Sequence, residues 1–86
     1  MTEATTLTRV CITFQMQNDF ETAEQCIIIP MKFSTAERLY YYLANRDRPT
    51  PEDCGVYSLV NDLCSTAALL MGYSLLDIVS AEEVPQ

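Results

Sequence analysis

Cysteine is the residue type with the greatest chemical potential in this chain, which has four cysteines and no histidine. Zinc sites are usually built from closely spaced cysteine and histidine pairs, and a cysteine nucleophile needs a base such as histidine beside it. Successive cysteines here are separated by 15, 28 and 10 positions. We therefore expect no metal, no cofactor and no catalytic residue, and hence no enzyme. The four residues are Cys11, Cys26, Cys54 and Cys64.

Cys54 is the cysteine whose position most favours reactivity. It falls in the first turn of a predicted helix, where the helix dipole lowers the pKa of a thiol. Its neighbours Glu52 and Asp53 are negatively charged and oppose thiolate formation. A thiol redox protein is thus the third interpretation of this chain, after a protein-binding module and a small regulatory or structural subunit. The polar N-terminal residues show no signal-peptide pattern, which favours a cytoplasmic location with reduced thiols.

The chain is acidic, with 12 Asp and Glu against 5 Lys and Arg and a formal net charge of −7 at pH 7. This charge repels nucleic-acid phosphates and favours a protein partner with a basic surface, although it would also serve solubility alone. Two glycines are too few for a phosphate-binding loop. The longest apolar run, Ala67–Met71, is too short to span a bilayer. We expect no direct binding to nucleic acid or to a membrane.

Tyr41 is the strongest candidate for a contact with a partner protein. In a helix it lies almost opposite the apolar stripe and one turn from Arg38, and Tyr and Arg dominate interface hot spots. The alternative is an incidental surface tyrosine. Leu69 also points away from the predicted core. Acidic residues near the predicted hairpin and on the second helix are expected to face a basic partner: Asp19, Glu21, Glu24, Glu52, Asp53 and Asp62.

Two strands joined by a hairpin open the predicted fold. Apolar and polar residues alternate over 7–16, which is typical of a strand with one buried face. Turn-forming residues follow at 17–21, with Asn18 and Asp19 in the loop, and a β-branched run covers 23–29. Pro30 either ends this second strand or places it at a sheet edge, because proline cannot donate to a ladder.

Two helices and a third strand complete the pattern. Ser34 and Glu37 have the spacing of a capping box at the start of a helix that runs to about Asn45. Thr50 has the position of an N-cap for the second helix, and Gly72 that of its C-cap. The third strand is predicted over 73–80. Leu76 and Ile78 are expected on one of its faces, with Leu75, Asp77 and Val79 on the other.

The elements indicate a single α+β domain, 1–86, with the order ββααβ. We expect an antiparallel three-stranded sheet with two helices packed on one face, and loose ends at 1–6 and 81–86. The strand order stays open, although pairing of the last strand with the first would bring the chain ends together. The predicted core, with Leu63 as a central member, comprises Val10, Ile12, Phe14, Ile28, Leu39, Leu43, Leu59, Leu63, Leu70 and Ile78.

The leading interpretation is a non-catalytic, acidic protein-binding module. A small acidic domain of this kind is similar in type to the inhibitors that phages and plasmids make against host defence complexes, a resemblance that carries no individual residue. It implies a basic or nucleic-acid-binding partner and competition with nucleic acid. The alternative is a small regulatory or structural subunit, homodimeric through an open sheet edge, without an inhibitory role. An inhibitor predicts carboxylates clustered on one face, whereas a homodimer predicts an apolar, weakly charged face.

Overall fold

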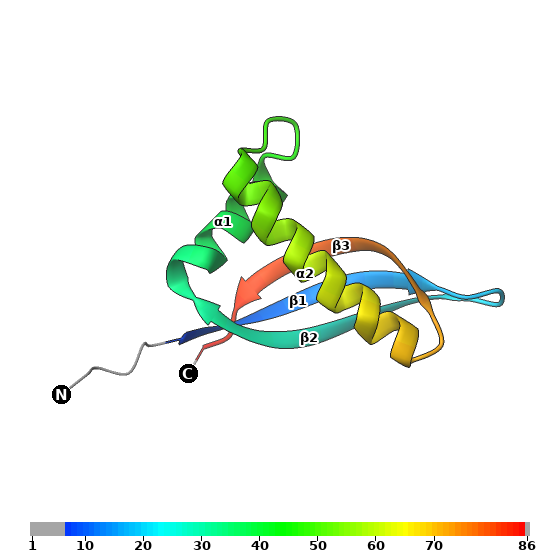
Figure 1. Cartoon of the computed structure of the whole chain (residues 1–86). Helices are drawn as coiled ribbons and strands as arrows, with labels where there is room; N and C mark the ends of the chain where they lie inside the picture. Colours follow the sequence, from blue (N-terminus) through cyan, green and yellow to red (C-terminus); the bar gives the residue numbers. More distant parts are fainter. Residues whose placement is uncertain (1–6, 86) are drawn as a thin grey trace.

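The computed structural model describes residues 7–85 and shows a three-stranded antiparallel sheet with two helices on one face (Figure 1). The elements are β1 (Leu7–Gln17), β2 (Thr22–Lys32), α1 (Phe33–Ala44), α2 (Pro51–Leu70) and β3 (Ser74–Glu83). The strand order is β2-β1-β3, so the last strand does lie beside the first. The predicted α+β class and the ββααβ order are confirmed.

β1 is the central strand, and its even-numbered side chains form the buried inner face of the sheet, as the alternating pattern predicts. These side chains are Val10, Ile12, Phe14 and Met16. β2 is an edge strand in which Pro30 pairs with Arg9. The proline is tolerated there because an edge strand needs only one of its two sides for the ladder.

β3 differs from the prediction in its faces and in its length. The pairing of β1 with β3 shifts register after Thr13 and again after Gln15. Because each shift inserts a residue, Leu75 and Ile78 both face the helices while Leu76 is exposed. The strand continues to Glu83, so the predicted loose end at 81–86 is wrong for its first half, residues 81–83. The predicted loose segment 1–6 lies outside the described residues.

The predicted capping box at the start of α1 is wrong. The N-cap residue is Lys32, the last residue of β2, and no side chain bonds to the free amides there. Because the strand runs directly into the helix, Ser34 already lies inside the first turn and cannot cap it. α1 buries Ala36 and Leu39 against the sheet.

Both predicted ends of α2 are confirmed. The Asp53 amide donates to the Thr50 hydroxyl oxygen over 3.2 Å. At the other end Gly72 has a positive φ of 84°. The Tyr73 amide donates to the Ala68 carbonyl (2.9 Å) and the Gly72 amide to the Leu69 carbonyl (3.0 Å), which is the Schellman pattern.

α2 turns its small side chains, not its leucines, toward the sheet. Its buried apolar residues are Val60, Cys64 and Ala68. Apolar residues occupy more than one side of this helix, and small ones allow its axis to approach the strands closely. The predicted core is therefore wrong for four residues, which are exposed: Leu59, Leu63 and Leu70 on α2, and Ile28 on the outer face of β2. The other six predicted members are buried or partly buried in one cluster.

Candidate protein-binding surface

The solvent side of α2 carries four exposed leucines, which we call the leucine face. Their exposed fractions are 67% for Leu59, 50% for Leu63, 65% for Leu69 and 84% for Leu70. The steps from 59 to 63 and from 63 to 70 follow one side of a helix, and Leu69 flanks that line. Leu59 and Leu63 are direct neighbours on the helix surface, and several exposed apolar residues on one helix mark interaction sites more often than isolated ones do. The predicted exposure of Leu69 is confirmed, and three further leucines join it.

The charges along the leucine face are negative. Asp62 is exposed and lies one turn beyond Leu59, and Glu52 is exposed in the first turn of α2. Neither α2 nor the rest of the chain from residue 49 to 86 contains a Lys or Arg. The leucine face therefore combines apolar side chains with carboxylates, and α2 itself supplies no cation to balance them.

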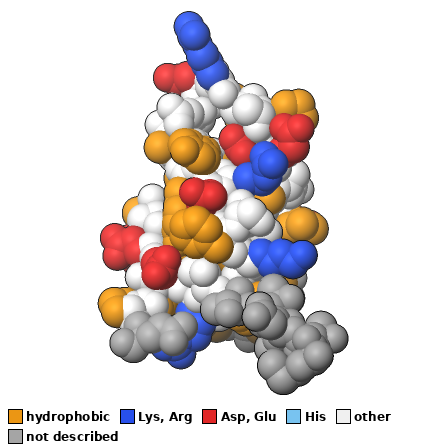
Figure 2. Space-filling view, turned by 90° about the vertical axis from the view of Figure 1, so that its left-hand side faces the viewer, with side chains coloured by type: hydrophobic (Ala, Val, Ile, Leu, Met, Phe, Trp, Pro, Cys, Tyr) orange, Lys and Arg blue, Asp and Glu red, His pale blue; other side chains and the backbone are white. Residues whose placement is uncertain are grey.

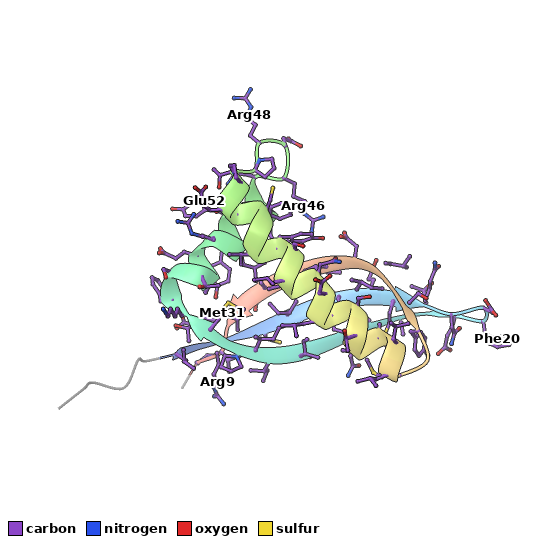
Figure 3. All side chains as sticks on the ribbon, in the orientation of Figure 1. Arg9, Phe20, Met31, Arg46, Arg48 and Glu52 are labelled. Carbon is purple, nitrogen blue, oxygen red and sulfur yellow. The ribbon has the colours of Figure 1, made fainter. Side chains whose placement is uncertain are left out.

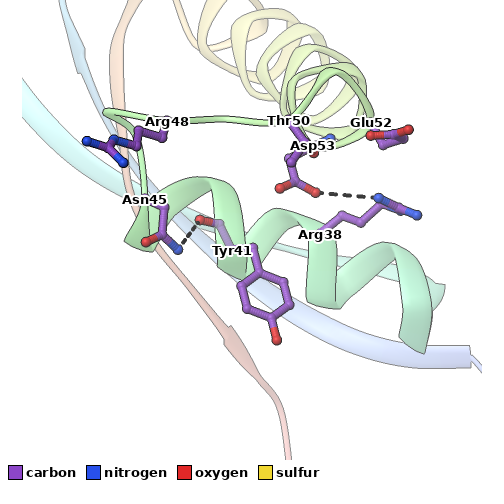
Figure 4. A pocket seen from close by; sticks show the side chains of 7 residues that line it. All are labelled: Arg38, Tyr41, Asn45, Arg48, Thr50, Glu52 and Asp53. Carbon is purple, nitrogen blue, oxygen red and sulfur yellow. Dashed lines mark hydrogen bonds and ion pairs between the residues drawn. The ribbon is translucent and has the colours of Figure 1, made fainter.

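A hollow of about 500 Å³ lies between α1 and the start of α2 (Figure 4). Tyr41 forms part of its wall and is 61% exposed, so its predicted exposure is confirmed. The hollow is lined by Arg38, Tyr41, Asn45, Arg48, Thr50, Glu52 and Asp53. Four of these residues, Arg38, Tyr41, Glu52 and Asp53, are ones that the sequence nominates as partner contacts.

Asp53 belongs to the fold more than to the surface. It is only 8% exposed, and its carboxylate lies 3.6 Å from the Arg38 guanidinium. The prediction that Asp53 is exposed is therefore wrong, because the first turn of α2 packs against α1. With Arg38 and Arg48 against Glu52 and Asp53, the hollow is balanced in charge. Figure 2 shows charged side chains of both signs interspersed with hydrophobic ones on the side that carries α1.

Arg46 holds the connection between the helices against the sheet. Its guanidinium donates to the Ile78 carbonyl (2.6 Å) and to both carboxylate oxygens of Asp77 (3.3 Å each). The same guanidinium lies 5.9 Å from the centre of the Tyr57 ring, which stacks on Tyr42 at 4.1 Å. These contacts fix α1, α2 and β3 relative to one another, and so set the shape of the hollow. Arg46 and Arg48 are not among the residues nominated from the sequence, although their place beside Pro49 in the connection between two helices is a signal that could have identified them.

The remaining nominated acidic residues, Asp19, Glu21 and Glu24, lie at or next to the β1–β2 hairpin loop. This loop is at the end of the molecule opposite the hollow, and the longest dimension of the fold is 52 Å (Figure 3). The six nominated carboxylates therefore do not form one cluster. They divide between the hairpin, the leucine face and the hollow.

Two of the four thiols have raised pKa values. All four cysteines are free, and burial raises the pKa of the Cys64 thiol from 9.0 to about 11. Partial burial also raises the pKa of Cys11, and so does the hydrogen bond that its thiol donates to Cys26. A raised pKa lowers the fraction of reactive thiolate. Cys54 lies in the first turn of α2, as its sequence position predicts, and its side chain is exposed.

No three His, Cys, Asp or Glu side chains within residues 7–85 come together as a metal site would require. In the same part of the chain, no helix is both long enough and apolar enough to cross a membrane. No protein-family model, curated protein or solved structure matches this chain. Its function has therefore to be argued from its surfaces.

Proposed function

We propose that this chain is a non-catalytic protein-binding module that engages a protein with a basic and partly apolar surface through the leucine face of α2. The observation that carries the proposal is the orientation of this helix. It buries Val60, Cys64 and Ala68 and leaves Leu59, Leu63, Leu69 and Leu70 in solvent.

Because these leucines are exposed, a partner that buries them would gain binding free energy from the hydrophobic effect. Burying one leucine side chain contributes about 1.5–3 kcal/mol, so a partner that covers several of them gains the core of an interface. Tyr41 and Glu52 line the hollow between α1 and the start of α2, which offers a second contact. An exposed tyrosine is a typical hot-spot residue.

Charge favours a different protein over a second copy of this chain. Each copy carries a formal net charge of −7, and the leucine face itself has Asp62 and Glu52 but no cation on α2. Two such faces brought together would repel each other, whereas Lys and Arg on a partner would pair with the carboxylates.

A partner with such a basic surface would be one that binds nucleic acid. Binding of this acidic chain would cover that surface and compete with the phosphate backbone, which would make the chain an inhibitor of the kind that phages and plasmids direct against host defence complexes. The clustering of carboxylates on one face that this interpretation predicts is not found among the six nominated residues, which divide among three places. The support for this step is the charge of the chain and the absence of basic residues from α2.

The test is recovery of a partner from cells of the source organism by the tagged full-length chain. The test variant is the double substitution Leu59→Ser with Leu63→Ser. The matched control is Ile28→Ser, which changes an equally exposed apolar side chain on the opposite face of the sheet. Wild type and control should retain a partner that the double variant loses, and nucleic acid should displace it. Equal recovery by all three chains, with the variants folded by circular dichroism, would sink the proposal.

A further inference from the structure

The loop between β1 and β2 presents an aromatic side chain almost entirely to solvent. Phe20 is 94% exposed, the highest exposure among the large hydrophobic side chains of the described residues. Figure 3 shows Phe20 at the extreme tip of the hairpin, beyond the end of the helical layer. A phenylalanine in this position buries almost none of its surface within the fold.

The loop that carries Phe20 is held in one conformation by hydrogen bonds. The Asn18 side-chain oxygen accepts from the amides of Phe20 and Glu21, both at 2.8 Å. The Asn18 amide donates to the Glu21 carbonyl over 2.9 Å. The Tyr73 hydroxyl, just after α2, donates to the Glu21 carboxylate, and this bond raises the pKa of Tyr73. Because Asn18 and Glu21 make the turn, Phe20 is not needed for it.

The charges around this tip have one sign. Phe20 lies between Asp19 and Glu21, and Glu24 follows in β2. No Lys or Arg occurs between Arg9 and Lys32. In Figure 3 the labelled arginines, Arg9, Arg46 and Arg48, all lie away from the tip. An anionic membrane surface or a nucleic acid would be repelled here, whereas Lys and Arg side chains of a protein would be attracted.

We infer that Phe20 is a preformed anchor that inserts into an apolar pocket rimmed by Lys or Arg on a partner protein, with Asp19 and Glu21 pairing with the rim. An aromatic ring in a pocket surrounded by polar contacts is the usual composition of an interface hot spot. The ordered loop lowers the entropic cost of binding, because little flexibility is lost. The inference rests on the proposed function only in that the chain binds a protein, and it adds a second contact site and its chemistry.

The experiment places the photoreactive residue benzoylphenylalanine at position 20 of the full-length chain in cells of the source organism. The control chain carries it at position 28, on the outer face of the sheet. We expect position 20, and not position 28, to cross-link to one protein, at a site with apolar residues and neighbouring Lys or Arg. No cross-link, a cross-link to a second copy of this chain, or attachment at an acidic or fully polar site would overturn the inference.

The purified cross-linked partner then provides a quantitative measurement. Phe20→Ala should weaken binding at least about tenfold, and its thermal midpoint should equal that of the wild type because the side chain is exposed. Unchanged affinity of Phe20→Ala overturns the anchor. Measured beside it, the Leu59→Ser and Leu63→Ser double variant reports on the leucine face alone. Normal binding by that variant refutes the proposed function of α2 without affecting the result for Phe20.

Discussion

Cys64 is completely buried beneath α2, whereas its neighbour in sequence, Leu63, is half exposed on the side of the same helix that faces solvent. The boundary between the packed and the free surface of α2 thus runs between these two residues. The larger and more apolar of the two lies outside. The buried side chains of α2 stabilise the fold, whereas its exposed leucines are available to a partner protein.

Two leucine-to-alanine substitutions test that separation with the same loss of side-chain atoms. Leu39 is completely buried, so Leu39→Ala should lower the free energy of unfolding by about 2–5 kcal/mol through cavity formation. Leu63→Ala should lower it by less than about 1 kcal/mol, because half of that side chain is already in water. Urea denaturation of both variants gives the comparison. Equal losses would place Leu63 in the core after all.

The N-terminal ends of the two helices provide a second pair of variants to compare. Thr50→Ala removes the hydroxyl that accepts from the Asp53 amide and should cost about 1 kcal/mol. Ser34→Ala removes a hydroxyl that caps nothing, because α1 begins at Phe33 with Lys32 as its N-cap, and stability should stay within about 0.5 kcal/mol. Thermal denaturation distinguishes them. A loss at Ser34 as large as at Thr50 would restore the capping box that the sequence suggests.

The two glycines should respond in opposite directions to alanine. Gly72 has a φ of 84°, where a Cβ is unfavourable, so Gly72→Ala should cost about 1–2 kcal/mol. Gly55 lies within α2 and has open space where the methyl group of an alanine would project, so Gly55→Ala should stabilise the protein by about 0.5–1 kcal/mol. Chemical denaturation measures both changes, and a gain at Gly72 would contradict the Schellman geometry.

Cys64 should make the stability of the protein depend on alkaline pH. Its thiol ionises with a pKa of about 11 in the fold and near 9.0 when exposed, so its protonated form favours folding. This contribution is complete below about pH 9 and is lost as the pH rises toward 11. The free energy of unfolding should therefore fall more steeply above pH 9 in the wild type than in Cys64→Ala. All other ionisable groups are the same in both proteins, so parallel curves would mean that Cys64 is not protected by burial.

Local signals in the sequence predict much of this fold. The alternation of β1, the turn at Asn18, the cap at Thr50 and the glycine at residue 72 all act through neighbouring residues, and all are confirmed. The buried side of α2 could not be predicted in the same way, because apolar residues lie on more than one side of it. The choice between Leu63 and Cys64 depends on how closely the helix approaches the sheet.

The candidate site is predictable to a similar extent. The helical geometry places Tyr41 and Leu69 outside the core, as the structure has them. Asp53 is nominated as exposed because the sequence does not reveal that Arg38 lies against it. Phe20 is not among the residues nominated from the sequence. Its place between two acidic residues in a predicted turn nevertheless indicates that its side chain is exposed.

The most direct test of the central claim is the kinetics of binding between the purified partner and this chain over a series of salt concentrations. Screening shortens the Debye length from about 10 Å at 0.1 M to about 3 Å at 1 M, so association should slow steeply while dissociation changes less. The Leu59→Ser and Leu63→Ser double variant should dissociate at least about tenfold faster with a similar association rate. Association that is insensitive to salt, together with unchanged dissociation of the double variant, would contradict the account.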